Sequence, residues 1–299
     1  MTGDSSKRPG LEAAIGRVRS AADRIERRAA LLLAATLDRD DAALREGAPL
    51  PPGWHWLYFL DAPLTGQLGE DGRTVPGGFL PDTGLPRRMW AGGTIDFDAP
   101  LPLGSEATCE ARIDNIEAKQ GRSGPLVFVT TRHVISSGGR RAVEERRDLV
   151  FRGLPGEDEP QRREQAPGCG TWRRVVTPDP VLLFRFSALT FNAHRIHYDV
   201  DYCRAVEGYP TLVVHGPLLA LLMLDLVARE RPDGVVRSFA YRVLAPLYSG
   251  SPFAVCGCER EGGAELWVEG PDGTLATKGR VAFRGGLSAS PPAVLLPRP

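Results

Sequence analysis

Long apolar runs, net charge and paired cysteines are all missing from this sequence of 299 residues. The longest apolar run, residues 217–227, is interrupted by Asp225 and is too short to span a bilayer. The polar first ten residues contain no apolar stretch of the signal-peptide type. We therefore expect a soluble protein of the cytoplasm with no membrane partner.

The charge balance and the cysteines exclude further classes of protein. Lys+Arg and Asp+Glu both number 37, which argues against a surface that binds nucleic acid. The five cysteines are scattered and form no CxxC pair, so the sequence predicts neither a disulfide framework nor a zinc site. Hydrophobic residues make up 42% and charged residues 25%, as in an ordinary globular protein, and the length suffices for two domains.

The apolar pattern changes along the chain. Helical spacing of apolar residues among many Arg and Ala predicts a helix over Leu11–Leu44, and the Pro-rich stretch Pro51–Pro63 predicts a packed loop or a short helix. Later segments alternate and predict antiparallel strands. These strands are expected at Met89–Phe97, Ala107–Ala118, Leu126–Ser136, Arg146–Arg152, Trp172–Val176, Val236–Leu244, Phe253–Arg260, Glu265–Glu269 and Thr274–Phe283.

Helices are expected between the strands of the second half. The segments are Pro178–Thr190, capped by Thr177, a short helix at Asp201–Val206, and the strongly apolar His215–Arg229. A stretch rich in Pro, Gly and charge separates the two halves and has almost nothing to bury. The expected division is a disordered leader (1–10), a first domain (11–152), a linker (153–170) and a second domain (171–299).

A short internal repeat indicates that the two halves are related. Ala99–Ser105 and Ala245–Ser251 share five of seven residues, are 146 residues apart, and each lies between two expected strands. Only the second half has a long apolar helix before its copy; the corresponding stretch Val75–Pro86 is too rich in Pro and Gly to form one. A helix wrapped by a curved antiparallel sheet is the hotdog arrangement. We therefore expect an α+β double hotdog with a degenerate first helix and one active site, in the second half.

Histidines near an asparagine and a helix start are the candidate chemical groups. Histidine titrates near neutrality without perturbation, so His194 and His197 are candidate acid–base groups, and Asn192 could hold a water or a substrate oxygen. The free N–H groups where the helix begins, at His215 and Gly216, would favour an oxygen that gains negative charge. Taken singly, each histidine is more often structural, and His215 is equally well explained as a helix cap. No third ligand stands near the histidine pair, so no metal is expected.

The same residues carry a family resemblance. The run RFSALTFNAHRIHYD, Arg185–Asp199, followed by Val214-His215-Gly216, resembles the signature of MaoC-type hydratases. In that family an Asp stands where this chain has Asn192, and a Gly, an Asn and a Pro stand at Phe191, His194 and Arg195; the histidine at His197 is retained. Because an Asn cannot act as a base, the usual division of labour between Asp and His does not carry over.

The variant run nevertheless resembles one subgroup of that family. The subgroup contains type 2 hydroxyacyl-thioester dehydratases and mesaconyl- or itaconyl-CoA hydratases, and the stretches PPGWHWLYF and RRMWAGGTIDF of the first half are similar to it as well. The resemblance implies a hydro-lyase for a short enoyl or 3-hydroxyacyl thioester. His197, with or without His194, would move the proton, Asn192 would position water or the carbonyl, and the Gly216 N–H would stabilise the enolate.

Substrate contacts and rival functions complete the expectation. Arg195 is the expected partner of a substrate carboxylate, with His215 and Tyr198 as further substrate-binding residues, and coenzyme A enters only as part of the substrate. The open alternatives are a dehydratase acting on acyl carrier protein, an acyl-CoA thioesterase, and a non-catalytic acyl-CoA-binding protein. A homodimer is a candidate assembly; no other cofactor is expected.

Overall fold

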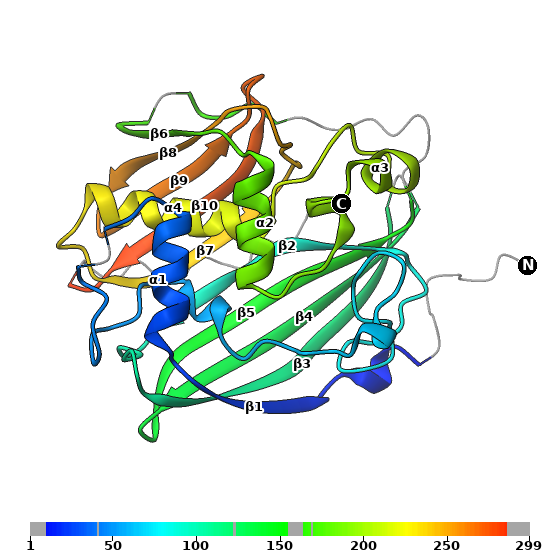
Figure 1. Cartoon of the computed structure of the whole chain (residues 1–299), viewed down its shortest axis with the longest axis horizontal. Helices are drawn as coiled ribbons and strands as arrows, with labels where there is room; N and C mark the ends of the chain where they lie inside the picture. The colour runs from blue at the N-terminus through cyan, green and yellow to red at the C-terminus, as the bar shows by residue number, and fades with distance from the viewer. Residues whose placement is uncertain (1–9, 41, 122–123, 155–163, 169, 286–299) are drawn as a thin grey trace, which may run out of the picture.

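Ten strands form one antiparallel sheet, which is the framework of the molecule (Figure 1). The computed structural model describes residues 10–40, 42–121, 124–154, 164–168 and 170–285. The strand order is β1-β3-β4-β5-β2-β7-β10-β9-β8-β6. The strands are β1 (Val18–Arg24), β2 (Arg87–Phe97), β3 (Glu106–Gly121), β4 (Gly124–Ser137), β5 (Arg140–Arg152), β6 (Trp172–Val176), β7 (Val236–Val243), β8 (Phe253–Arg260), β9 (Gly263–Glu269) and β10 (Leu275–Phe283).

The sheet consists of two halves with the same strand order. The N-terminal half, β1-β3-β4-β5-β2, repeats as the C-terminal half, β6-β8-β9-β10-β7, and the two meet where β2 pairs with β7. The matching heptads occupy equivalent corners, Ala99–Ser105 between β2 and β3 and Ala245–Ser251 between β7 and β8. The predicted relation between the halves therefore agrees with the topology. The expected leader, apart from Gly10, and residues 155–163 of the expected linker lie outside the described residues.

The long helix predicted for Leu11–Leu44 is wrong. That segment forms a 3-10 turn η1 (Glu12–Ala14), the edge strand β1 and only one helix, α1 (Arg27–Thr36). The residues of β1 have no strong strand preference, yet they pair in continuous antiparallel register with β3 from Arg112 to Glu106. Pairing with a distant strand outweighs local helix propensity here.

The helices of the C-terminal half match their predicted positions closely. Helix α2 (Pro180–Leu189) begins with proline, and its cap is Asp179, whose side chain accepts from the Leu182 N–H at 2.7 Å; the predicted cap, Thr177, is wrong. A 3-10 turn η4 (Arg195–His197), the short helix α3 (Val200–Tyr202) and a π-helical turn η5 (Cys203–Glu207) follow. Helix α4 (Gly216–Glu230) is buried from Leu218 to Val227, as its apolar sequence predicts.

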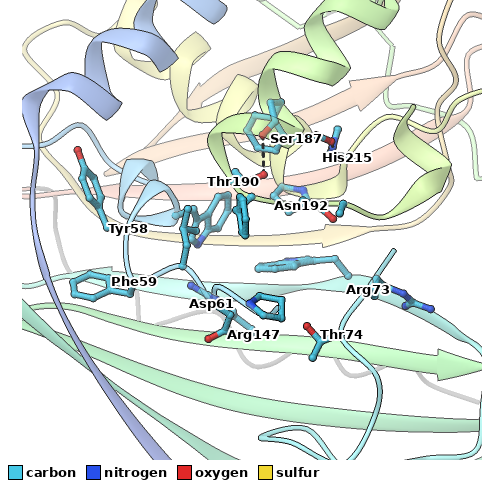
Figure 2. A pocket seen from close by; sticks show the side chains of 18 of the residues that line it. Tyr58, Phe59, Asp61, Arg73, Thr74, Arg147, Ser187, Thr190, Asn192 and His215 are labelled. Atoms are coloured by element: carbon cyan, nitrogen blue, oxygen red, sulfur yellow. Dashed lines mark hydrogen bonds between the residues drawn. The ribbon is translucent and has the colours of Figure 1, made fainter. Parts of the chain in front are cut away.

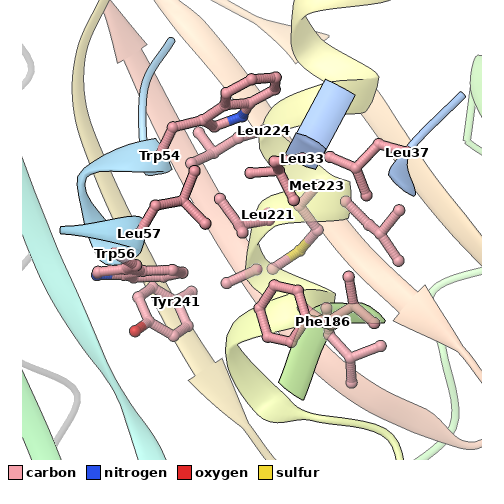
Figure 3. Close-up of a cluster of buried hydrophobic side chains, with 14 of the residues drawn as sticks. Leu33, Leu37, Trp54, Trp56, Leu57, Phe186, Leu221, Met223, Leu224 and Tyr241 are labelled. Carbon is pink, nitrogen blue, oxygen red and sulfur yellow. The ribbon is translucent and has the colours of Figure 1, made fainter. Parts of the chain in front are cut away.

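The main core surrounds α4, between the strands of the C-terminal half and helices α1 and α2. Figure 3 shows side chains from α1, α2, α4, β7 and the 3-10 turn η2 (Trp54–Leu57) packed in one cluster. The labelled members are Leu33, Leu37, Trp54, Trp56, Leu57, Phe186, Leu221, Met223, Leu224 and Tyr241. Through this cluster, segments from both halves hold α4 in place.

The N-terminal half lacks a counterpart of α4, as predicted. Between α1 and β2 the described chain forms only η2 and the 3-10 turn η3 (Thr65–Gln67), besides irregular segments. In Figure 1 the helices gather over the C-terminal half, while β3 and β4 are crossed only by the chain that leads from η2 toward β2. No helix in the described part of the chain combines the length and apolar character needed to cross a membrane.

The single charge in the buried part of α4 is neutralised by arginines. Asp225 is 1% exposed and pairs with Arg174 of β6, with Arg229 at 2.8 Å, and with Arg39 at 3.3 Å. These contacts tie α4 to the edge strand of its own half and to the segment that follows α1. Asp225, which interrupts the apolar sequence of α4, therefore fixes this helix to its neighbours through these ion pairs.

Replacing Asp225 by alanine should lower the free energy of unfolding by about 2–3 kcal/mol. The loss is smaller than for a fully enclosed pair, because the three arginines are partly exposed and regain solvent. Chemical denaturation of the purified variant measures it. Arg229→Ala, which removes one of three partners, should cost less than about 1 kcal/mol; an equal loss in both variants would contradict this description.

Candidate active site

A cavity of about 820 Å³ lies where the N-terminal half lacks a helix. Its sheet side is formed by inward-facing residues of β1 to β5, and its opposite side by the end of α2, the loop after it and the start of α4. Figure 2 shows Ser187, Asn192 and His215 on one side of this space and Arg147 on the other. The missing helix therefore leaves room for a ligand between the two halves.

His197, at the end of η4, presents one ring nitrogen for chemistry. The residue is 7% exposed and lines the cavity. Its Nδ1 lies 2.7 Å from the carbonyl oxygen of Val213. A carbonyl can only accept, so Nδ1 carries the proton and Nε2 keeps its lone pair. His197 thus has the tautomer of a general base.

Burial keeps the His197 ring neutral. Desolvation, aided by the neighbouring His194 and opposed by the bond to Val213, lowers its pKa to about 3. The ring of His215 is stacked on it, with centroids 3.5 Å apart and planes inclined by 17°. Burial and the two other histidines also lower the pKa of His215 well below its usual value. Both rings are therefore uncharged at neutral pH.

His215 orients His197 and does not cap the helix. It stands at the cap position of α4, but its side chain makes no capping bond. Its Nε2 lies 2.9 Å from Ser187 Oγ, and the ring of Phe186 meets it edge-on at 4.9 Å. Only 1% of its surface is exposed, so the His215 ring is held in one position against the face of His197.

Asn192 presents hydrogen-bond donors. Its Oδ1 accepts from the backbone N–H of His194 at 3.1 Å, which fixes the orientation of the amide and leaves the Nδ2 group as a donor. The preceding Phe191 has a φ of 47°, a strained conformation for a non-glycine residue, and places Asn192 N–H 2.8 Å from the Ser187 carbonyl. The amide can therefore hold a water or a substrate oxygen but cannot accept a proton.

Gly216 supplies a free backbone N–H at the cavity. It is the first residue of α4, where N–H groups have no partner within the helix, and the next residue, Pro217, has none to offer. No backbone bond of the Gly216 N–H occurs among the described residues. A Cβ at Gly216 would lie 3.7 Å from Cβ of Trp90, so the helix start lies directly against β2. This amide and the helix dipole favour a developing oxyanion.

Two predicted site residues do not line the cavity. His194 is buried beside His197, edge-on at 5.6 Å, and its Nε2 lies 3.0 Å from Glu207. Arg195 pairs with Asp199 at 2.7 Å and donates to the Glu70 carbonyl. Neither side chain therefore lies where it would touch a substrate in the cavity, and the structure does not support the predicted partnership of Arg195 with a substrate carboxylate.

Tyr198, another predicted substrate contact, lies at the rim of the cavity. Tyr198 is half exposed, lines the cavity, and its hydroxyl donates to the Ala193 carbonyl at 3.0 Å. The same loop is held from the N-terminal half, where the Asp71 carbonyl accepts from Arg195 N–H at 2.9 Å. At Gly72, whose φ is 80°, a Cβ would lie 1.9 Å from the Ala193 carbonyl oxygen, so only glycine fits at this approach.

The sheet side of the cavity is built around a buried carboxylate. Glu145 is 0% exposed and accepts from His55 Nε2 at 3.0 Å, Trp56 Nε1 at 2.9 Å and Arg147 at 2.7 Å. Despite its burial, Arg147 and His55 hold the pKa of the Glu145 carboxyl well below its usual range. The carboxylate therefore fastens η2 to β5, and the fastened Trp56 limits the cavity on that side.

Comparison with known proteins identifies the family. The model of the family hydroxyacyl-thioester dehydratase type 2 matches residues 53–249. This chain belongs to that family. A mesaconyl-C(4)-CoA hydratase from Chloroflexus aurantiacus is 44% identical over 273 residues, which cover 91% of this chain and 97% of that protein. The mitochondrial hydroxyacyl-thioester dehydratase type 2 of Schizosaccharomyces pombe is 30% identical over 246 residues, 74% of this chain and 80% of its own.

Solved structures confirm the predicted double hotdog. HtdX of Mycobacterium tuberculosis has a TM-score of 0.65 at 16% identity, covering 91% of this chain and 100% of its own. A second protein of that organism, described as having a double hotdog fold, has a TM-score of 0.58 at 14% identity, with coverages of 90% and 96%. The predicted membership among hydratases and dehydratases is likewise confirmed, and the chain is an enzyme of the hydro-lyase class.

Several residues of this hydroxyacyl-thioester dehydratase site were missed by the sequence reasoning. Ser187 stands inside the recognised run but was given no role, and Glu207 behind His194 carries no sequence signal. Glu145 and Arg147, on the sheet side, lie on β5, where no site residue was expected. The pairing of strands far apart in sequence places Arg147 at the cavity and Glu145 behind its lining residues.

Proposed function

We propose that the chain catalyses the reversible addition of water across the α,β double bond of a short enoyl-CoA, most of all a dicarboxylic one of the mesaconyl type. The observation that carries this proposal is the neutral His197 ring, with its free Nε2 at a cavity that also contains the Gly216 N–H. The named activity of the 44% identical relative supports the substrate class.

The proposed chemistry needs one base and two donors. His197 Nε2 takes a proton from water, whose oxygen is held by the Asn192 amide and forms a bond to the β-carbon. The electron pair of the double bond shifts toward the thioester oxygen, where the Gly216 N–H stabilises the enolate. The enolate collapses and its α-carbon takes the proton back from His197, so that water has been added and the imidazole is neutral again. Dehydration runs the same steps in reverse.

His194 acts in this scheme as a positioning residue. Its bond to Glu207, which Arg87 approaches at 3.4 Å, fixes the ring against the edge of His197. His215 and Ser187 hold the other face. The imidazole that moves the proton is thereby restricted to one orientation, which reduces the reorganisation needed during the reaction.

A spectrophotometric hydration assay tests the function. Loss of enoyl absorbance should be fast with mesaconyl-C4-CoA, slower with crotonyl-CoA, and slowest with a long-chain enoyl-CoA, because the fastened η2 turn limits the cavity. No free thiol should appear in a parallel thiol assay. Release of thiol without loss of the double bond would identify a thioesterase and overturn the proposal.

The pH profile follows from the burial of His197. Because its pKa is lowered to about 3, the ring stays an unprotonated base far below the usual histidine range. We expect kcat/KM for hydration to change by less than about twofold between pH 8 and about pH 5, with no inflection near 6.5. Activity that falls tenfold per pH unit below 6.5 would show a ring that titrates normally.

The same shift has a cost in stability at acid pH. An unfolded histidine has a pKa of about 6.5 and binds a proton below it, whereas folded His197 binds one only near 3. The free energy of unfolding is therefore unaffected by this group above pH 6.5. As the pH falls from 6.5 toward 3, it decreases by up to about 1.4 kcal/mol per pH unit. Circular dichroism at each pH shows whether the protein assayed is still folded.

A further inference from the structure

Four arginine side chains line the cavity, and three of them have anionic partners. The four are Arg19, Arg73, Arg88 and Arg147. Three of them are paired: Arg19 with Asp61 at 2.5 Å, Arg73 with Asp71 at 2.6 Å, and Arg147 with Glu145 at 2.7 Å. Within the described residues, the fourth guanidinium, that of Arg88, makes no hydrogen bond or ion pair.

The positive charge of Arg88 has no anionic partner among the described residues, which is unfavourable unless an anion binds there. Burial, aided by the charge of Arg73, lowers the pKa of Arg88 to about 10, and the charges of Asp71 and Asp61 offset this only in part. Arg88 is only partly buried, and a partly desolvated cation without a counter-ion still raises the energy of the folded protein. An anionic ligand would remove that cost, and the flat guanidinium presents paired donors that match a carboxylate.

Arg88 lies on the strand that supports the helix start. It stands two residues before Trp90 on β2, and residues two apart on a strand face the same side, about 7 Å apart. Both line the cavity, and Gly216 lies against Trp90. A thioester oxygen at the Gly216 N–H would therefore have the Arg88 side chain within reach of the remainder of a short acyl group.

We infer that Arg88 binds the free carboxylate of a dicarboxylic acyl-CoA and thereby selects that substrate class; the inference rests on the proposed function. In a mesaconyl-type thioester the carboxylate is attached to the β-carbon, one double bond from the thioester carbon. An anchor on that carboxylate and a donor on the thioester oxygen would fix the double bond at both ends. The carbon that water attacks is then held toward Asn192 and His197.

Two saturated thioesters isolate this contact from catalysis. Succinyl-CoA and butyryl-CoA have four-carbon acyl groups and the same CoA, and differ in the terminal carboxylate; neither has a double bond to hydrate. Isothermal titration should show that the wild-type protein binds succinyl-CoA about 10–100-fold more tightly. In Arg88→Gln this preference should disappear, with succinyl-CoA weakened by that factor and butyryl-CoA changed by less than about threefold.

Matched variants make the result specific. Arg19→Gln removes a cation that also lines the cavity but is already paired with Asp61, so the preference for succinyl-CoA should persist. Arg88→Lys keeps the charge without the paired donors and should retain only part of the preference. If Arg88→Gln weakens both ligands equally, the arginine serves the CoA moiety; if the wild type has no preference, no carboxylate site exists. Either result overturns the inference.

A hydration assay on the same proteins separates this inference from the proposed function. Loss of activity toward mesaconyl-C4-CoA in Arg88→Gln, with the binding preference lost as well, supports both. A wild-type protein that prefers succinyl-CoA but hydrates no enoyl-CoA would contradict the function and leave Arg88 as a carboxylate site. A wild-type protein that hydrates enoyl-CoA but shows no preference for succinyl-CoA would support the function and overturn the Arg88 site.

Discussion

Replacing His197 by alanine is expected to reduce kcat/KM for enoyl-CoA hydration by about 10²–10⁴-fold, because the ring nitrogen that accepts the proton of water in the proposed scheme is removed. His197→Gln should be equally inactive although it fills most of the space against His215. The measurement is the initial rate of loss of enoyl absorbance, with circular dichroism to show that each variant is folded.

A second buried histidine provides the control for this prediction. His133 is 5% exposed, also lines the cavity and also has a pKa lowered by burial, to about 2, but it belongs to the sheet side and bonds Thr131. His133→Gln should reduce kcat/KM by less than about tenfold. Equal losses in both variants would mean that the cavity needs buried histidines in general and that His197 has no special role.

Replacing Glu145 by alanine is expected to lower the free energy of unfolding by about 3–5 kcal/mol. The change leaves the Arg147 charge, the His55 ring and the Trp56 indole N–H without their shared acceptor. Urea denaturation followed by fluorescence measures the loss, and binding of a CoA thioester should weaken as well, since η2 is no longer fastened to β5.

The adjacent residue makes a matched control. Glu144 points to the other face of β5, its side chain is 25% exposed, and its partners Arg132 and Arg141 are themselves exposed to solvent. Glu144→Ala should therefore cost less than about 1 kcal/mol. A loss as large as that of Glu145→Ala would show that burial and the three shared donors are not what makes Glu145 important.

The part of the site that could be predicted is the part that is local in sequence. Asn192, His197 and Gly216 lie within 25 residues, and a loop followed by a capless apolar helix brings them to the same place. Their spacing and the resemblance of the run Arg185–Asp199 to the family signature were enough to select them as candidates. His194 and Arg195, equally close in sequence, point elsewhere because Glu207 and Asp199 bind them.

The part that could not be predicted depends on pairing across the two halves. Glu145 and Arg147 alternate with partly buried charged residues along β5, and no local pattern distinguishes the inner face. Arg88 gains its position from the pairing of β2 with β5, in which it lies opposite Phe151. The misread segment before residue 44 has the same cause, since β1 is a strand only because β3 lies beside it.

The stereochemistry of hydration in heavy water tests the single-base account most directly. If His197 both takes the proton from water and returns it to the α-carbon, deuterium and hydroxyl must arrive on the same face of the double bond. Nuclear magnetic resonance of the hydrated product should therefore show syn addition alone. Anti addition would require a second acid on the opposite side of the substrate and would contradict the assignment of both proton transfers to His197.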